Sequence, residues 1–185
     1  MPKVDQSYLD ARRRQIVDAA RRRFARQGFA GTSLADIVAE SGLSNGAIYR
    51  YFASKDDIVV AICEDTTSEV LPHELTATAI GEFLEDLRAT ARDDGHARLV
   101  AQIYAEAAVS PTVAAVVQQQ LAVLRDTVAA LLPERNPTDT ARIAEAFVAL
   151  CVGYSQQLAV RGDVDSAPFA AALMAIVDPQ HADDR

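Results

Sequence analysis

Two short helical segments on either side of Gly42 constrain the fold of this chain more than any other feature. Ser33 and Asp36 have the spacing of a capping box, in which a side chain and a backbone N–H group cap each other at a helix start. Ser44 caps the second segment, and Gly42 provides the turn between the two. Residues 45–51 are too few to build a core alone, so this segment must pack against other helices.

The apolar residues of these segments fall where a helix-turn-helix buries them. Ile37, Leu43 and Ile48 are spaced so that all three face one interior when two helices meet at a glycine turn. The preceding segment, residues 9–27, has apolar residues near helical spacing on one face and seven arginines over the remaining surface. The sequence therefore predicts a small three-helix unit with a basic surface.

Charge is divided unequally along the chain. Residues 1–55 carry ten Lys and Arg against five Asp and Glu, a net charge of +5. Residues 56–185 carry eight against 21, a net charge of −13. Such a division indicates a basic module that meets phosphates, although two ordinary solvated surfaces would give the same totals. We expect one or two of Arg12, Arg13 and Arg14 to steer phosphates.

Few features of the sequence suit an enzyme or a membrane protein. The three histidines are isolated, and we find no metal-binding, nucleophile or phosphate-loop motif, so we predict no catalytic residue, metal or cofactor. Cys63 and Cys151 lie far apart and indicate reduced thiols in the cytoplasm. No apolar run approaches the roughly 18 to 20 residues of a membrane span, and the N-terminus lacks a signal peptide's apolar region. A cytoplasmic protein without a membrane partner is expected.

One long stretch carries a family resemblance. The run GFAGTSLADIVAESGLSNGAIYRYFASKDDI, residues 28–58, closely resembles the DNA-binding domain of TetR-family transcriptional regulators. Its most specific part is Ile48-Tyr49-x-Tyr51-Phe52-x-x-Lys55, directly after Gly42-Leu43-Ser44. The resemblance implies an all-α fold with an N-terminal three-helix DNA-binding domain that contains the helix-turn-helix, residues 1–55. It also implies a C-terminal helical bundle for ligand binding and dimerisation, residues 56–185.

The helix at residues 45–51 is expected to enter the major groove of DNA. Asn45 can pair with adenine, and Arg50 can give guanine two parallel hydrogen bonds. The alternative for Asn45 and Tyr49 is helix capping and local packing. The resemblance implies phosphate anchors at Ser33 and Lys55, which Thr32 and Tyr51 would join. The expected DNA-binding residues are Thr32, Ser33, Asn45, Gly46, Ala47, Tyr49, Arg50, Tyr51 and Lys55.

The helix predicted between Thr138 and Val160 has two apolar sides. A stripe of large residues suits the core of its own domain, and a stripe of small residues would allow another helix to approach closely. In the resembled family the last two helices form a four-helix bundle across a two-fold axis, so we expect a C2 homodimer. A thick monomer core is the alternative. The expected interface residues are Ala146, Ala149, Gly153, Val160, Phe169, Leu173 and Ile176.

A ligand pocket is expected among the helices that follow Pro72. A mostly apolar cavity with a few polar groups would take a small lipophilic molecule. The candidate lining residues are Ile62, Thr66, Phe83, Leu87, Leu99, Ile103, Tyr104, Val117, Gln120, Phe147 and Tyr154. An ordinary place in the core is the alternative for most of them.

These expectations describe a ligand-responsive transcriptional regulator. In this interpretation it is a repressor that binds a pseudo-palindromic operator in double-stranded DNA as a homodimer, and a small molecule releases it. Three alternatives stay open: control by a protein partner, action without a small-molecule ligand, and activation rather than repression.

Overall fold

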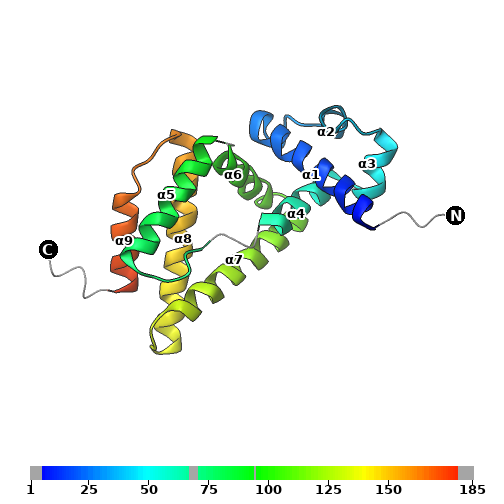
Figure 1. Cartoon of the computed structure of the whole chain (residues 1–185). Coiled ribbons are helices and arrows are strands. Elements are labelled where there is room, and N and C mark those ends of the chain that lie inside the picture. The colour runs from blue at the N-terminus through cyan, green and yellow to red at the C-terminus, as the bar shows by residue number, and fades with distance from the viewer. Residues whose placement is uncertain (1–5, 67–70, 94, 179–185) are drawn as a thin grey trace. The chain divides into compact units, whose positions relative to one another are not determined.

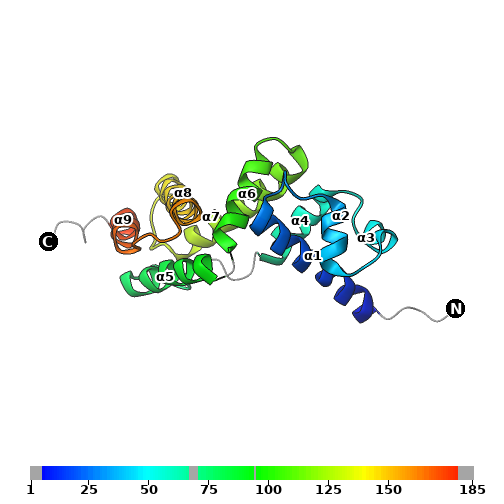
Figure 2. The same ribbon diagram turned by 90° about the horizontal axis from the view of Figure 1, so that it is seen from above.

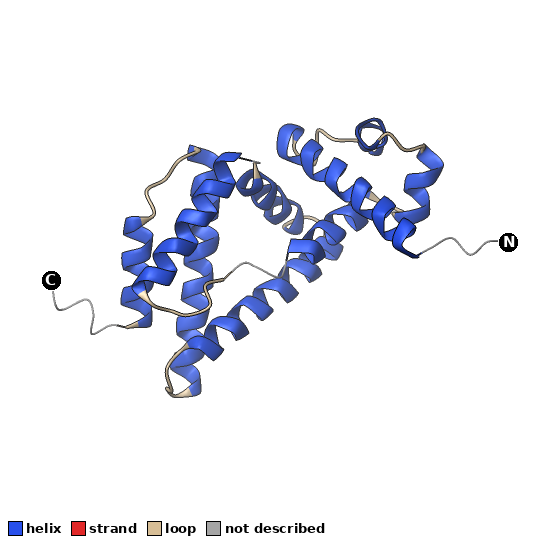
Figure 3. Cartoon of the chain, in the orientation of Figure 1, coloured by secondary structure: helices blue, strands red, loops and turns tan. Residues whose placement is uncertain are grey.

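In the computed structural model the chain is a series of helices joined by short loops (Figures 1 and 3). The structure describes residues 6–66, 71–93 and 95–178. The helices are α1 (Gln6–Gln27), α2 (Leu34–Ser41), α3 (Asn45–Tyr51), α4 (Lys55–Thr66), α5 (Ala77–Asp93), α6 (His96–Ala107), α7 (Pro111–Leu131), α8 (Pro137–Arg161) and α9 (Ala167–Val177). No strand occurs within these three ranges, and the all-α prediction is confirmed.

The chain divides into two compact units. Unit 1 consists of Met1–Thr67 and Gln102–Val116, and unit 2 consists of Ser68–Ala101 and Val117–Arg185. Helices α6 and α7 contribute to both, because the turn between them and the two helix ends beside that turn belong to unit 1. The functional domain boundary that the sequence places after residue 55 stays a prediction.

Unit 1 is built around α1, which packs against α2 and α4 (Figure 2). Its core contains the fully buried side chains of Ile16, Ile37 and Ile48, one from each of the first three helices. The predicted turn is present: Gly42 adopts φ 68°, and its N–H group donates to the carbonyl of Val38. This left-handed conformation is the reason that glycine ends α2.

The predicted capping box starts α2. The Ser33 hydroxyl accepts from the N–H group of Asp36 at 3.2 Å, and the Asp36 carboxylate accepts from the N–H group of Ser33 at 2.8 Å. Helix α8 begins at Pro137 and not at the predicted Thr138. Asn136 caps this helix by accepting from the N–H group of Asp139, because Pro137, which lacks an N–H donor, fits the first helical position.

In unit 2, helices α5, α8 and α9 lie side by side (Figures 1 and 2). The stripe of large residues on α8 contributes Phe147, Tyr154 and Leu158 to the core of unit 2. Helices α5 and α9 contribute Leu84 and Leu173 to the same core. The Tyr154 hydroxyl donates to the carbonyl of Val164 at 3.1 Å, so its polar end is satisfied inside the unit.

Helix α8 is long and apolar enough to span a membrane, by length and composition alone, and so are α6 and α7 taken together, although they are bent by 120° where they meet. The prediction that no apolar run approaches the length of a membrane span is therefore wrong for α8. Burial within unit 2 accounts for the apolar residues on one side of α8, since a core helix can have the same length and composition.

Replacing Phe147 with Ala should destabilise the fold by about 3–5 kcal/mol, because a fully buried aromatic ring leaves a cavity. Urea unfolding at fixed protein concentration measures this difference. Val109→Ala, at a side chain 77% exposed, is the matched control and should change the free energy of unfolding by less than about 0.5 kcal/mol. Equal effects of the two substitutions would contradict the described core.

Candidate nucleic-acid interface

Helix α3 buries one face and presents the other to solvent. Ile48 is fully buried, whereas Asn45, Arg50 and Tyr49, which is 57% exposed, lie on the outside. The polar groups of these three exposed side chains form no hydrogen bond or ion pair with any other residue that the structure describes. They are therefore available to an external partner such as the edge of a base.

The N-terminus of α3 is capped without help from Asn45. The Ser44 hydroxyl accepts from the N–H group of Ala47 at 3.3 Å. Gly46 has no atom within 4 Å of the position that a Cβ would take, so this end of the helix is open to close approach. The capping role considered for Asn45 thus belongs to Ser44.

Two of the expected phosphate anchors are engaged inside unit 1. Thr32 is 2% exposed, and its hydroxyl donates to the carbonyl of Gly28 at 2.8 Å. The Ser33 hydroxyl is exposed and lies 2.5 Å from the Asp36 carboxylate, to which it donates. Thr32 therefore shapes the loop before α2, and the first N–H groups of α2 are the free donors at this end.

Lys55 also faces inward. Its Nζ donates to the carbonyls of Phe29 at 2.6 Å and Thr32 at 2.9 Å, and it lies 3.9 Å from the centroid of the Phe29 ring. The ammonium thus fixes the loop at residues 28–32, which connects α1 to α2. An ammonium has three N–H donors, so one remains beyond these two hydrogen bonds.

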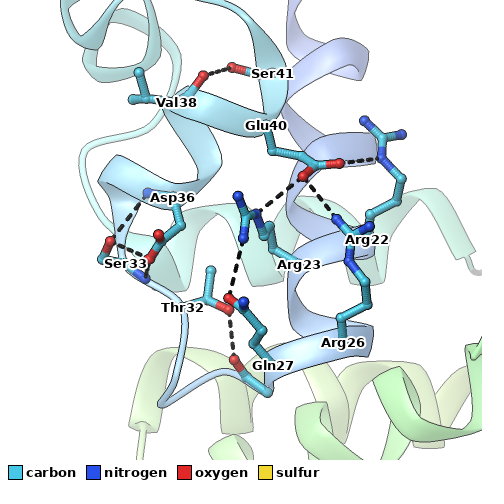
Figure 4. A network of polar contacts seen from close by, with 11 residues as sticks. Arg22, Arg23, Arg26, Gln27, Thr32, Ser33, Asp36, Val38, Glu40 and Ser41 are labelled. Atoms are coloured by element: carbon cyan, nitrogen blue, oxygen red, sulfur yellow. Dashed lines mark hydrogen bonds and ion pairs between the residues drawn. The ribbon is translucent and has the colours of Figure 1, made fainter.

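Three arginines of α1 meet one carboxylate of α2 (Figure 4). Arg22 and Arg26 contact Glu40 at 3.0 and 2.8 Å, and Arg23 lies 3.2 Å from it. The hydrogen bond from Arg22, supported by Arg26 and by the charge of Arg23, lowers the pKa of Glu40 despite opposing desolvation. The network joins α1 to α2 and leaves an excess of positive charge on this surface.

The three arginines near the start of α1, Arg12, Arg13 and Arg14, differ in their contacts. Arg13 pairs with Glu64 at 3.2 Å, and its guanidinium lies 5.7 Å from the centroid of the Phe52 ring. Arg12 donates to Gln15 at 2.7 Å. Arg14 is exposed and has no polar partner among the described residues, so it is the member best placed to meet a phosphate.

The expected pocket residues are distributed over both units. Five are buried, namely Ile62, Leu99, Val117, Phe147 and Tyr154. Phe83, Leu87, Ile103, Tyr104 and Gln120 are half-buried, and the side chain of Thr66 lies outside the described part of the chain. Their contact with a ligand stays a prediction.

Unit 2 contains a cleft of about 570 Å³ at another place. It lies at the ends of α5, α7 and α9, and its lining includes Leu75, Arg135 and Met174 but none of the expected pocket residues. The Arg135 guanidinium donates to the carbonyl of Val177 at the end of α9.

The expected interface residues mostly face outward. Ala146, Ala149 and Val160 are exposed, and open space surrounds the position of a Cβ on Gly153. Phe169 and Ile176 are half-buried. Leu173 is fully buried in the core of unit 2, so the prediction that it faces a partner is wrong.

Both cysteines are buried thiols outside any disulfide. Burial raises the pKa of Cys63 to about 11 and that of Cys151 to about 12. Both thiols are therefore protonated at neutral pH, which makes them poor nucleophiles. Among the described residues, no group of three His, Cys, Asp or Glu side chains is placed to hold a metal ion.

Two family models match the chain. The model for bacterial regulatory proteins of the tetR family matches residues 16–62, and the model for the C-terminal region of BetI-type transcriptional repressors matches residues 72–181. Among curated relatives, an uncharacterised HTH-type transcriptional regulator of Bacillus subtilis, YfiR, is 34% identical over 99 residues. That alignment covers 50% of this chain and 48% of the relative, so the chain spans about half the length of this relative.

Solved structures share the fold over nearly the whole chain. Salmonella enterica GusR has a TM-score of 0.72 at 22% identity. The alignment covers 95% of this chain and 99% of GusR. The multidrug binding protein EbrR, solved in complex with ethidium, has a TM-score of 0.68 at 24% identity, with 90% of this chain and 98% of that chain covered.

Replacing Glu40 with Gln should flatten the acid side of the stability profile. Because the folded-state pKa of Glu40 lies below its ordinary value of 4.5, the unfolded chain binds the proton more readily. The contribution of Glu40 is therefore complete above about pH 4.5 and is lost as pH falls through the lower folded-state value. Thermal unfolding midpoints over a pH series measure the effect.

Salt provides the control for this experiment. High ionic strength screens exposed charges, so the wild-type profile should approach that of Glu40→Gln. Parallel profiles of the two proteins at low salt would show that the three arginines do not stabilise this carboxylate.

Proposed function

This chain belongs to the TetR family of bacterial regulatory proteins, and from that premise we propose that it is a repressor that a small apolar molecule releases from its operator. The family membership makes it a DNA-binding transcriptional regulator with a helix-turn-helix. The proposal adds which residues read DNA, how the protein assembles and what controls it.

The exposed face of α3 carries the proposal. Asn45, Tyr49 and Arg50 extend from a helix whose opposite side is anchored by Ile48, and they have no polar partner among the described residues. In the major groove the amide of Asn45 would pair with adenine and the guanidinium of Arg50 with guanine. Gly46 and Ala47 would let the helix approach the base edges.

Phosphate contacts would come from the margins of unit 1. The first N–H groups of α2, after Ser33, would donate to a phosphate oxygen, and the remaining N–H of Lys55 would add charge. Arg14 offers an exposed guanidinium. The half-buried Tyr51 has a hydroxyl that would serve as a further donor. Thr32 is left out because its hydroxyl is buried and occupied.

The surface of α8 supports a two-fold dimer. Ala146, Ala149 and Gly153 form an exposed or open stripe of small residues, and Val160 is an exposed aliphatic side chain, 84% accessible, near the end of the same helix. A partner helix would cover this face and that of α9 near Phe169 and Ile176. The two copies of α3 would then bind half-sites about 34–36 Å apart.

Control by a ligand would act through α4. This helix begins with Lys55, which holds the loop before α2, and carries Glu64, which pairs with Arg13 of α1. A ligand that binds the released state more tightly would shift α4 and the spacing of the two α3 helices, with a coupling of about 1–3 kcal/mol. The fold shared with EbrR, which was solved with ethidium bound, supports a small apolar or cationic ligand.

Fluorescence anisotropy tests the function directly. The probe is a labelled duplex from the DNA beside the protein's own gene, and the control is a scrambled duplex of equal length. We expect tight, salt-sensitive binding to the native duplex with two chains per site. Equal weak binding to both duplexes at two salt concentrations would contradict the choice of operator, and no binding to either would overturn the DNA-binding function.

Replacing Arg50 with Ala should weaken operator binding by about 1–3 kcal/mol, about fivefold to 150-fold, because a base-specific contact is lost. Binding to the scrambled duplex should change much less. Arg98→Ala, which removes an exposed arginine of α6 in unit 2, is the matched control. Equal losses on both duplexes would assign Arg50 to phosphate contact instead.

Replacing Ala149 with Glu should convert the dimer to a monomer, because it places charge in a closely packed interface of small residues. Sedimentation velocity measures the mass, and Ala130→Glu, at an exposed alanine of α7, is the control. An unchanged dimer in Ala149→Glu would mean that α8 does not form the interface.

A further inference from the structure

The loop that leads into α2 is held by side chains from a distant part of the chain. We propose that Gln102 and Ser110 are positioning residues for DNA binding, which fix this loop and the first turn of α4. Both come from residues 102–116, the end of α6, the start of α7 and the turn between them, which belong to unit 1. The inference rests on the proposed function and adds two residues that the helix-turn-helix does not contain.

Gln102 binds the backbone of the loop. The N–H group of Phe29 donates to its Oε1 at 3.3 Å. Gly28, at φ 75°, makes room for the amide: a Cβ there would lie 3.2 Å from Nε2 and 3.3 Å from Oε1 of Gln102. The backbone conformation of residue 28 thus favours glycine, and a Cβ there would come into tight contact with the amide of Gln102.

The same short loop is held from a second direction by Lys55. Its ammonium binds the carbonyls of Phe29 and Thr32, while Gln102 binds the N–H group of Phe29. The peptide groups on either side of Phe29 are thus fixed by two residues remote in sequence. The next residue after Thr32 is Ser33, the cap of α2, so the loop determines where the free N–H groups of α2 point.

Ser110 fixes the helix from which Lys55 extends. Its hydroxyl donates to the carboxylate of Asp56 at 2.7 Å and accepts from the N–H group of Val113 at 3.4 Å. Ser110 is 8% exposed, and Asp56 lies in the first turn of α4, next to Lys55. The two contacts therefore act on one assembly, the α1–α2 loop together with the lysine that holds it.

The geometry of the Gln102 contact suits a bond that is made and broken. At 3.3 Å it lies beyond the usual range for an N–H···O bond, and the site is only partly buried. Water would replace Gln102 at little cost, so the contact contributes little to global stability. Its effect is on the position of the loop, and a small displacement of this end of α6 would release Phe29.

Two substitutions of Gln102 separate positioning from stability. Gln102→Met keeps the length and removes the acceptor, whereas Gln102→Glu keeps an acceptor for the Phe29 N–H group. Gln118→Met, at an exposed glutamine of α7, is the matched control. Hydrogen exchange of the Phe29 amide, measured by NMR on the free full-length protein, reports the contact without DNA.

We expect Gln102→Met to speed exchange of the Phe29 amide and to weaken binding to the operator duplex about two- to tenfold, the range of one hydrogen bond. The melting temperature should stay close to that of Gln118→Met, and Gln102→Glu should keep the amide protected. Unchanged exchange in Gln102→Met, or faster exchange with unchanged affinity, would overturn the role of Gln102.

Ser110→Ala tests the second contact. Because this change also removes a hydrogen bond to the N–H group of Val113, Asp56→Ala serves as a second variant that removes the acceptor and leaves the Val113 contact in place. Both should weaken operator binding by a similar factor, and wild-type affinity in Asp56→Ala would overturn the role of Ser110. If the wild-type protein binds neither duplex, the proposed function fails, whereas hydrogen exchange of the Phe29 amide still tests the Gln102 contact.

Discussion

The shortness of α3 is the constraint on which the DNA-binding unit depends. A helix of seven residues is not stable alone in water, because nucleation costs more than so few hydrogen bonds return. Its position comes from Ile48 and Phe52, which are buried against the other helices of unit 1. Every contact that orders α1, α2 and α4 therefore also orders the residues that would read bases, including contacts far from the groove.

Charge in unit 1 has two separate uses. Arg22, Arg23 and Arg26 surround Glu40 and join α1 to α2, so their first role is structural. They still add to the positive field of the unit, which would steer DNA at long range. Residues without internal partners among the described residues, such as Arg14 and Arg50, are the ones available for direct contact. Net charge thus predicts the kind of partner, whereas pairing decides which arginine touches it.

Local signals in the sequence predicted much of unit 1. The Ser33–Asp36 capping box and the turn at Gly42 depend on neighbouring residues and were confirmed. Contacts between distant residues could not be predicted in this way, because Glu40 meets arginines 14 to 18 positions away and Gln102 meets Phe29 across 73. Leu173 was misplaced for a related reason. In an alanine-rich helix of 11 residues, the apolar pattern does not distinguish the face toward its own core from a face toward a partner.

The inward orientation of Lys55 bears on its proposed contribution to DNA binding. An ammonium that donates to two carbonyls of one loop keeps a third N–H, so holding the loop and meeting a phosphate are compatible. A phosphate bound there would strengthen the hold on Phe29 and Thr32, and an ordered loop would in turn present α2 to the phosphate. Because such coupling is reciprocal, if the ordered loop binds DNA more tightly by some factor, bound DNA favours the ordered loop by the same factor. In the proposed function, control would therefore require no direct competition with DNA, only a change in the residues that hold the α1–α2 loop.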